Sequence, residues 1–418
     1  MSATSIAPES IKFNNPGRVI IIGANFAGLT AAINLPRKYH AVVIDSRPYF
    51  EFLPNIHELL SGVKKAKSLR LHRKRLIERA GHRFLQDSVT TIDPVKKMVY
   101  TSGRKRLPFD ICVVATGGVN NTLGISGAAK FGLPFKTVAD CEKIGRHLKK
   151  IIRRDSRVSI VIVGGGLEGV EALGEILRRY RRYPRLEVHL IEKNSRLLNR
   201  MPDAVDRDLR KICKSFNVHF HTSNRVTKLA QDKVWLSSRE TLMADAIIWT
   251  GGAVPAPLLR KSGLTRRAAD WVAVSGSLQS KFVDSIFVAG DAADVPELKS
   301  KQAYHAIDMG EVVAANIKLL LAGEDLKTFR PASKPKIISF GDIQTYVVLG
   351  NFAVASPFLA GLKEAVFQAV MTKFDPPRGI SSVVDLYGRT SESLFNLTLP
   401  ALMSMLSLRQ LANFRLLT

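Results

Sequence analysis

Val19-Ile-Ile-Ile-Gly-Ala-Asn-Phe-Ala-Gly28 is the stretch of sequence that decides the fold. A short run of branched aliphatic residues ends at a glycine turn, and the turn opens into a segment of helical pattern. The same order returns in Val158-Ser-Ile-Val-Ile-Val-Gly-Gly-Gly-Leu-Glu-Gly169. Unpaired backbone N–H groups and the helix dipole make such a helix start a site for pyrophosphate. Two loops of this kind predict two dinucleotide-binding βαβ units.

A strand that ends in an acidic residue follows each loop. Asp45 lies 22 residues after Gly23, and Glu192 lies 28 residues after Gly164. A carboxylate at this place in a βαβ unit accepts hydrogen bonds from the ribose hydroxyls of an adenosine. We therefore expect one dinucleotide on each unit and electron transfer between the two.

The second loop is complete, with Gly164, Gly166 and Gly169, whereas the first loop departs from the pattern at Asn25. A glycine usually stands at that position because it lets the backbone approach the pyrophosphate. Asparagine tolerates unusual backbone angles better than most residues. We expect a less stringent first loop that still binds its ligand.

Glu192 bears on the choice between NADH and NADPH. Its carboxylate can accept hydrogen bonds from both ribose hydroxyls of NADH and would repel the 2′-phosphate of NADPH. Lys193 and Arg196 follow closely in sequence and would soften this preference. We expect NADH, with NADPH left open.

Two Thr-Gly-Gly turns, Thr116–Gly118 and Thr250–Gly252, indicate how the domains are arranged. Each ends an apolar strand, and such a pair suggests two chain crossings at the base of an inserted domain. The sequence predicts an α/β protein with two Rossmann-like dinucleotide-binding domains, the second inserted in the first. A small C-terminal α+β region with an amphipathic tail completes the expected architecture. The expected ranges are a flexible leader at 1–17, the first domain at 18–127 and 251–330, the second at 128–250, and the C-terminal region at 331–418.

The net charge of +26, from 62 Lys and Arg against 36 Asp and Glu, favours polyanionic partners. An anionic membrane, nucleic acid and acidic nucleotides all fit that charge. The basic clusters at 64–75, 149–154 and 178–185 lack the interleaved aromatic residues of a single-strand binder, and no DNA-reading motif accompanies them. We interpret them as solvated helix faces near a lipid surface and do not favour nucleic acid.

The three cysteines, Cys112, Cys141 and Cys213, share no CxxC or zinc-type spacing. This pattern favours a reducing compartment and argues against a disulfide framework. We expect three buried small hydrophobic side chains and no metal site.

Taken in order, these motifs resemble those of flavoproteins with two dinucleotide-binding domains. The resemblance is to the type II NADH:quinone oxidoreductases and their apoptosis-inducing-factor-2-like (ferroptosis suppressor) relatives, over about residues 18–375. It rests on the first glycine loop with Asp45, Ala115-Thr-Gly117, Gly164-Gly-Gly-Leu-Glu-Gly-Val-Glu171, Trp249-Thr-Gly-Gly252 and Gly290-Asp291.

The resemblance implies FAD in the first domain and NAD(P)H in the inserted domain. The cofactor-binding residues that we expect are Gly23, Asn25, Ala27, Gly28, Asp45, Pro54, Ala115, Thr116, Gly117, Gly164, Gly166, Gly169, Glu192, Gly252, Gly290 and Asp291.

Three of the implied roles have a structural alternative. Asp291 would hydrogen-bond the ribityl or pyrophosphate region of the flavin, or it is a simple turn residue. Glu171 is the expected catalytic residue, which positions nicotinamide or relays a proton to quinone; the alternative is a carboxylate favoured by the helix N-terminus. Pro54 would line the flavin, or it packs in the core.

The sequence also departs from its nearest patterns. Type II dehydrogenases carry glutamines on the helix after Gly-Asp, where this chain has Tyr304, Asp308 and Met309. These three positions therefore neither exclude quinone binding nor indicate it. They look closer to the apoptosis-inducing-factor-2-like branch. Sulfide:quinone reductases need a cysteine after Gly-Asp, and no cysteine follows Cys213. The CxxxxC of disulfide reductases is also missing.

The tail segment Leu394–Leu408 is uncharged and has apolar residues at helical spacing, with Pro400 inside it. Its fifteen residues fall short of the roughly 20 that span a bilayer. We expect an in-plane interfacial helix, with core packing or a homodimer interface as the alternative. Residues 1–17 do not read as a signal peptide. The expected location is intracellular, peripheral on a membrane at its cytoplasmic face or in mitochondria, without a transmembrane span.

The sequence thus predicts an FAD-dependent NAD(P)H dehydrogenase that passes two electrons from NADH to a quinone-type acceptor at a membrane surface. Two alternatives stay open. One is a flavin-dependent reductase of a small electron-carrier protein that docks on the basic face. The other is an apoptosis-inducing-factor-like redox signalling protein that binds nucleic acid through its charge.

Overall fold

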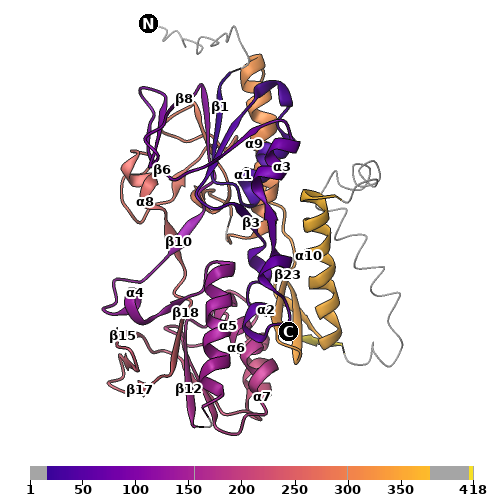
Figure 1. Cartoon of the computed structure of the whole chain (residues 1–418). Helices are drawn as coiled ribbons and strands as arrows, with labels where there is room; N and C mark the ends of the chain where they lie inside the picture. The colour runs from indigo at the N-terminus through magenta and orange to yellow at the C-terminus, as the bar shows by residue number, and fades with distance from the viewer. Residues whose placement is uncertain (1–16, 155, 299, 377–413, 418) are drawn as a thin grey trace, which may run out of the picture. The chain divides into compact units, whose positions relative to one another are not determined.

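The structure of the chain, a computed structural model, describes residues 17–154, 156–298, 300–376 and 414–417 (Figure 1). Residues 1–16 of the predicted leader and the predicted tail helix at Leu394–Leu408 lie outside the described residues. Within the described part, no helix combines the length and the apolar character that crossing a bilayer requires.

The chain divides into two units. Unit 1 comprises Met1–Phe50, Leu71–Gly118 and Pro255–Ala332, and unit 2 comprises Glu51–Arg70, Val119–Val254 and Ser333–Thr418. Residues 51–70 and the C-terminal residues thus belong with the second glycine loop, which differs from the domain ranges expected from sequence. The reason for the first difference is α2 (Glu58–Ser61), which packs on α5 and α6 of unit 2.

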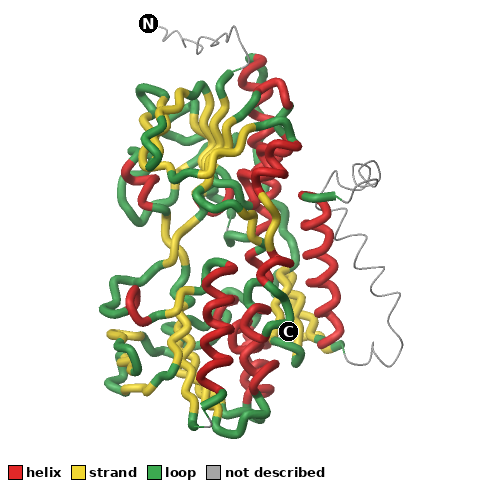
Figure 2. Tube along the Cα trace, viewed as in Figure 1, coloured by secondary structure: helices red, strands yellow, loops and turns green. Residues whose placement is uncertain are grey.

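Unit 1 is built on a parallel sheet of five strands in the order β21-β9-β1-β2-β5. Its central strand β1 pairs Ile20 with Val42 of β2 and with Cys112 of β9. All four residues of β1 are buried, as expected for a parallel strand covered on both faces. Helix α1 packs against α9, and Figure 2 shows both in red beside the yellow strands of the sheet.

The remaining elements of unit 1 complete its sheet and add small sheets around it. The bounds are β1 Val19–Ile22, α1 Phe26–Asn34, η1 Arg37–Tyr39, β2 Val42–Asp45, α3 Arg73–Arg79, β5 Arg83–Gln86, β6 Val89–Asp93, β7 Met98–Thr101, β8 Arg106–Pro108, β9 Ile111–Val114, α8 Pro257–Lys261, β20 Val272–Ala273, β21 Ile286–Val288, η4 Gly290–Ala292, β22 Ala293–Asp294 and α9 Ala303–Ala322.

Unit 2 contains a second parallel five-stranded sheet, in the order β11-β18-β12-β13-β14. An antiparallel meander, β15-β16-β17, packs on this sheet through a cluster that includes Val161, Val234 and Trp249. A four-stranded sheet, β23-β24-β25-β26, is antiparallel throughout. Strands β23 to β25, followed by α10, lie in the described part of the C-terminal region, which was predicted to be α+β.

The bounds in unit 2 are η2 Leu53–Asn55, α2 Glu58–Ser61, η3 Ala66–Leu69, α4 Ala128–Phe131, β11 Leu133–Pro134, α5 Val138–Ile152, β12 Val158–Val163, α6 Leu167–Tyr180, β13 Leu186–Ile191, α7 Asp203–Cys213, β14 Val218–His221, β15 Val226–Leu229, β16 Lys233–Leu236, β17 Thr241–Met243, β18 Ala246–Trp249, β23 Lys336–Phe340, β24 Gln344–Leu349, β25 Phe352–Ala355, η5 Pro357–Leu359, α10 Ala360–Phe374 and β26 Arg415–Leu417. The chain passes between the units within β3 Tyr49–Glu51, β4 Arg70–His72, β10 Gly118–Asn120 and β19 Ala253–Pro255, and again between Ala332 and Ser333.

The two parallel sheets, each with a strand–glycine turn–helix at its centre, confirm the predicted α/β fold class with two Rossmann-like units.

Candidate functional site: two dinucleotide cradles and a buried carboxylate

The first glycine loop joins β1 to α1 and needs glycine at both ends. Gly23 has φ +91°, and a Cβ there would lie 2.3 Å from the carbonyl oxygen of Ala115. A Cβ on Gly28 would lie 1.8 Å from the carbonyl oxygen of Gly23. Ala27 is buried in the first turn of α1, where a Cβ on Gly290 would come within 3.1 Å of its own Cβ. Helix, loop and strand are therefore packed as closely as a pyrophosphate cradle requires.

Asn25 does not need the conformational freedom of glycine. It precedes α1 with φ −97° and ψ −150°, an extended conformation open to every residue. We expected asparagine to be tolerated because it accepts unusual angles; the structure shows that the angles are ordinary. Gly166, at the same place in the second loop, is also extended, with φ −77°.

Asp45 ends β2 and closes the first loop. Its Oδ2 accepts the backbone N–H of Ala24 at 2.9 Å, and Arg73 Nη1 lies 2.6 Å from its Oδ1. Arg73 also donates to the carbonyl oxygens of Ala24 and Arg47, and its side chain is 1% exposed. The interpretation of the basic cluster at 64–75 as a solvated helix face is therefore wrong for Arg73. A buried arginine holds the predicted ribose carboxylate in place.

The residues after β9 and β21 supply a buried polar atom and open backbone positions. Thr116 Oγ1 is buried and has no hydrogen-bond partner in the described structure. Gly117 has φ +63° and nothing within 4 Å of the place where a Cβ would be. The backbone N–H of Gly290 bonds Met309 Sδ at 3.0 Å, and Lys301 Nζ bonds the carbonyl oxygen of Asp291. An orphaned hydroxyl beside an open, glycine-bordered space fits a bound dinucleotide.

The second loop repeats this construction between β12 and α6. Gly164 has φ +113°, and a Cβ on Gly169 would lie 1.8 Å from its carbonyl oxygen. Gly166 has nothing within 4 Å of an added Cβ. That open space lies at the start of α6, where the backbone N–H groups are free of helix partners. These residues fit a second pyrophosphate.

Glu192 closes the second loop as Asp45 closes the first. Its Oε2 accepts the backbone N–H of Gly165 at 2.8 Å, and its Oε1 accepts the backbone N–H of Asn194 at 2.8 Å. Arg196, which we expected to soften the preference for NADH, donates to the carbonyl oxygens of Met201 and Asn199, each at 2.8 Å. Arg196 is thus occupied by local backbone.

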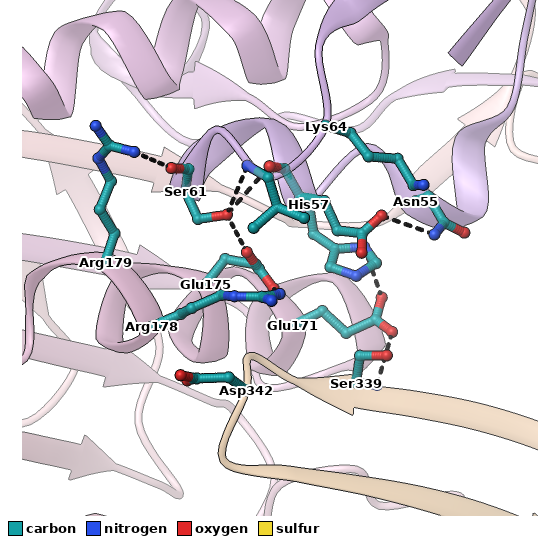
Figure 3. A network of polar contacts seen from close by, with 12 residues as sticks. Asn55, His57, Ser61, Lys64, Glu171, Glu175, Arg178, Arg179, Ser339 and Asp342 are labelled. Carbon is teal, nitrogen blue, oxygen red and sulfur yellow. Dashed lines mark hydrogen bonds and ion pairs between the residues drawn. The ribbon is translucent and has the colours of Figure 1, made fainter. Parts of the chain in front are cut away.

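Glu171 lies on α6, one turn after the loop, and contacts residues from three other segments of unit 2 (Figure 3). Lys363 Nζ on α10 lies 2.5 Å from Glu171 Oε1, which also accepts the N–H of Ser339 at 3.2 Å. His57 Nδ1, just before α2, lies 3.5 Å from Glu171 Oε2. His57 and Lys363, which sequence reasoning missed as site residues, therefore surround the predicted catalytic carboxylate.

Burial and the neighbouring charges set the protonation of this group. Burial raises the pKa of Glu171, although the Lys363 ammonium and the Ser339 N–H act against it. Burial also lowers the pKa of His57 well below its usual value, and Lys363, Arg178 and Lys64 lower it further. His57 is thus neutral. The tautomer with its proton on Nδ1 faces Glu171, and its Nε2 faces Lys363 Nζ at 3.4 Å.

A second buried carboxyl group, Glu175, lies four residues further along α6. Ser61 Oγ at the end of α2 contacts its Oε2, and Arg178 Nη1 lies 3.4 Å from its Oε1. Burial raises the pKa of Glu175 to about 7. Arg179 bonds the carbonyl oxygen of Ser61, which fixes the end of α2 (Figure 3).

The other predicted residues lie in different surroundings. Pro54 is half-buried in η2 of unit 2, and its contact with a flavin stays a prediction. Gly252, with φ +89°, has open space around an added Cβ. Met309, at a glutamine position of type II dehydrogenases, is buried and bonded to the Gly290 turn. Burial raises the pKa of Tyr304 to about 12, so its phenol is neutral.

The three cysteines are all free and buried, which confirms the prediction of small core side chains. Burial raises the pKa of each thiol, that of Cys213 to about 12. Such thiols are not nucleophilic at neutral pH.

Fold and cradles define a class of protein: an α/β protein with two Rossmann-like units, each with a dinucleotide loop closed by its own carboxylate. The chain belongs to the pyridine nucleotide-disulphide oxidoreductase family, whose model matches residues 17–310. It is therefore an oxidoreductase.

Two relatives and two solved structures place the chain further. It is 26% identical to demethylphylloquinone reductase NdbB of Synechocystis over 343 residues, 78% of this chain and 84% of that protein. It is 24% identical to the type II NADH:quinone oxidoreductase of Staphylococcus epidermidis, over 84% of this chain and 94% of the relative.

The fold is similar to that of NDH2 from Plasmodium falciparum in complex with NADH, with TM-score 0.75, 16% identity, and 85% and 95% of the two chains covered. It is also similar to the sulfide:quinone oxidoreductase of Aquifex aeolicus, with TM-score 0.76, 19% identity, and 89% and 96% covered.

Proposed function

We propose that this protein is an FAD-dependent NADH dehydrogenase that passes two electrons to a quinone at a membrane surface. The observation that carries the proposal is the pair of glycine cradles, each closed by a carboxylate, with Glu171, whose side chain is 12% exposed, on the helix that leaves the second cradle. Two relatives with quinone reductase names support the acceptor.

FAD is assigned to unit 1 and NADH to unit 2. The orphaned Thr116 hydroxyl, the open space at Gly117 and the Asp45–Arg73 pair support the flavin site. Glu192 supports NADH over NADPH, because a 2′-phosphate would meet a fixed carboxylate and Arg196 is occupied elsewhere. Lys193 remains as a cation close to Glu192 in sequence.

Bound FAD supplies the transfer of two electrons from NADH to the acceptor. The overall reaction is NADH + H⁺ + quinone → NAD⁺ + hydroquinone, so each turnover consumes one proton from solvent. A buried acid with a raised pKa suits that proton transfer, because it is protonated at a pH where an exposed glutamate is not. We assign this role to Glu171, with Lys363 and His57 holding its carboxyl group in place.

Membrane association is proposed from surface character. Leu349, Phe352 and Leu416 are exposed apolar side chains on the β24–β25–β26 part of unit 2. The net charge of +26 favours an anionic lipid surface. The predicted interfacial tail would add to both contributions, and homodimer formation stays a prediction.

The test uses the purified FAD-loaded chain without oxygen. NADH should bleach the flavin absorbance faster than NADPH does, and a short-chain quinone should restore it. Glu171→Gln should leave bleaching intact and slow the recovery by about 10²-fold or more, the usual cost of losing a positioned acid. A flavin that stays bleached with quinone but recovers with a small iron–sulfur carrier protein would instead favour the carrier-reductase alternative.

A further inference from the structure

Glu175 and Ser61 form a buried polar pair one helical turn beyond Glu171 (Figure 3). Because Glu171 and Glu175 are four residues apart on α6, both carboxyl groups project from the same face of the helix. The Glu175 side chain is 1% exposed, and its contact with Arg178 is 3.4 Å long. Deep burial disfavours the ionised form of a carboxyl group, and a cation at this distance compensates for burial only weakly.

The hydrogen bonds of Ser61 give an independent indication of a proton on Glu175. Ser61 Oγ lies 3.1 Å from the carbonyl oxygen of Glu58 and also contacts Glu175 Oε2. A hydroxyl has one proton and can donate it to one of these two acceptors. When it donates to Glu58, the contact with Glu175 is a hydrogen bond only if the carboxyl group brings its own proton. The raised pKa, about 7, makes that form accessible at neutral pH.

Charged and titratable groups from several elements face this pair. They are Glu171, Arg178 and Arg179 on α6, His57 and Glu58 at α2, Lys64 after α2, Lys363 on α10 and Asp342 after β23. Glu58 acts on both buried carboxyl groups: after burial itself, its charge also raises the pKa of Glu171 and of Glu175. Each of the two groups is therefore harder to ionise than an exposed glutamate.

Exposed residues flank the Ser61 end of the network. Arg179, which bonds the Ser61 carbonyl oxygen, is exposed, and so are Gly62 and Val63 directly after Ser61. The Glu171 side chain is 12% exposed and contacts His57 and Lys363. Ser61 and Glu175 thus lie between the exposed residues after α2 and Glu171.

We propose that Glu175, together with Ser61, stores the proton that restores Glu171 after each turnover, an inference that rests on the role proposed for Glu171. NADH brings two electrons and one proton to the hydroquinone, and Glu171 gives the second proton and becomes a carboxylate. The proton of Glu175 then moves across one helical turn to Glu171, directly or through one bridging water. Glu175 regains a proton from solvent at the Ser61 end. Glu175 would act through Glu171, so it is a positioning residue.

The experiment compares full-length, FAD-loaded wild type with Glu175→Gln, which keeps the shape and removes the acid. Anaerobic stopped-flow records flavin bleaching by NADH and its recovery with a short-chain quinone from pH 6 to pH 9. Bleaching should be unchanged, whereas recovery should be about tenfold slower, less than the loss of a direct acid, and should lose its pH dependence near pH 7. Ser61→Ala should shift that pH dependence, and Glu175→Asp should restore part of the rate.

Glu187→Gln is the matched control, since Glu187 is another poorly exposed glutamate of unit 2 and pairs with Arg157 outside this network. It should leave both rates unchanged. Infrared difference spectra between pH 6 and pH 8 give a readout apart from turnover: the wild type should show a carboxyl signal that Glu175→Gln lacks. Recovery of Glu175→Gln at the wild-type rate and pH profile, or an unchanged infrared signal, overturns the relay alone. A wild type that no quinone reoxidises overturns the proposed function and the relay with it.

Discussion

Replacing Glu175 by glutamine should change how the stability of the protein depends on pH. Burial raises the pKa of Glu175 from 4.5 to about 7, and its side chain is 1% exposed, so solvent screening is negligible. One pKa unit corresponds to about 1.4 kcal/mol, which makes the whole effect about 3 kcal/mol. Because the folded pKa is raised, this contribution is complete below about pH 4.5 and is lost as the pH rises to about 7. Glutamine does not titrate, so the free energy of unfolding of the variant does not fall in this pH range for this reason.

The assay is urea unfolding of wild type and Glu175→Gln at several pH values, with the difference in free energy of unfolding taken at each. That difference should move in favour of the variant by about 3 kcal/mol between pH 4 and pH 8. Glu187→Gln should change in the opposite direction. Although burial acts the other way, the Arg157 hydrogen bond and His189 hold the pKa of Glu187 below its usual value. A Glu175→Gln difference that stays constant within about 1 kcal/mol would refute the protonation argument.

Three further substitutions test the cradles. Arg73→Met leaves the Asp45 carboxylate without its buried cation, so thermal unfolding should show a loss of about 3–5 kcal/mol and fluorescence titration weaker FAD binding; a change below 1 kcal/mol contradicts the pair. Gly169→Ala places a Cβ 1.8 Å from the carbonyl oxygen of Gly164, so calorimetry should find NADH binding lost while the flavin remains bound. Glu192→Ala should weaken NADH binding by about 1–3 kcal/mol without a matching gain for NADPH, and tight NADPH binding by this variant would contradict the geometry of the second cradle.

Local sequence rules predicted the parts of this fold that depend on a few neighbouring residues. A glycine turn between a buried strand and a helix is a local pattern, and the structure has both loops at the positions predicted from it. The carboxylates at the ends of β2 and β13 follow from the same unit, because a parallel neighbour strand ends beside the loop. The helix at α9 and the burial of the cysteines were likewise predictable.

Residues distant in the chain escaped the prediction. Lys363 lies 192 residues from Glu171, and nothing near it in sequence marks it as a partner for a buried acid. His57 was visible at the end of an aromatic, proline-containing segment, but its role depends on where α2 packs. Arg73 stands among other basic residues in the sequence, so its charge suggested an exposed side chain. In the structure it is buried in an ion pair with Asp45 at the end of β2. A cluster of charged residues predicts exposed side chains on average. It does not indicate which of its cations forms a buried ion pair with a carboxylate.

The two ribose carboxylates have a consequence for engineering. Asp45 and Glu192 each accept the backbone N–H of the residue after the first glycine of their own loop, Ala24 and Gly165. The carboxylate that is predicted to bind the ribose therefore also holds in place the peptide that is predicted to bind the phosphates. Changing coenzyme preference by shortening Glu192 would release that peptide at the same time. A redesign toward NADPH needs a cation for the 2′-phosphate and also a new hydrogen-bond acceptor for the backbone N–H of Gly165. Coenzyme preference and loop conformation therefore have to be changed together.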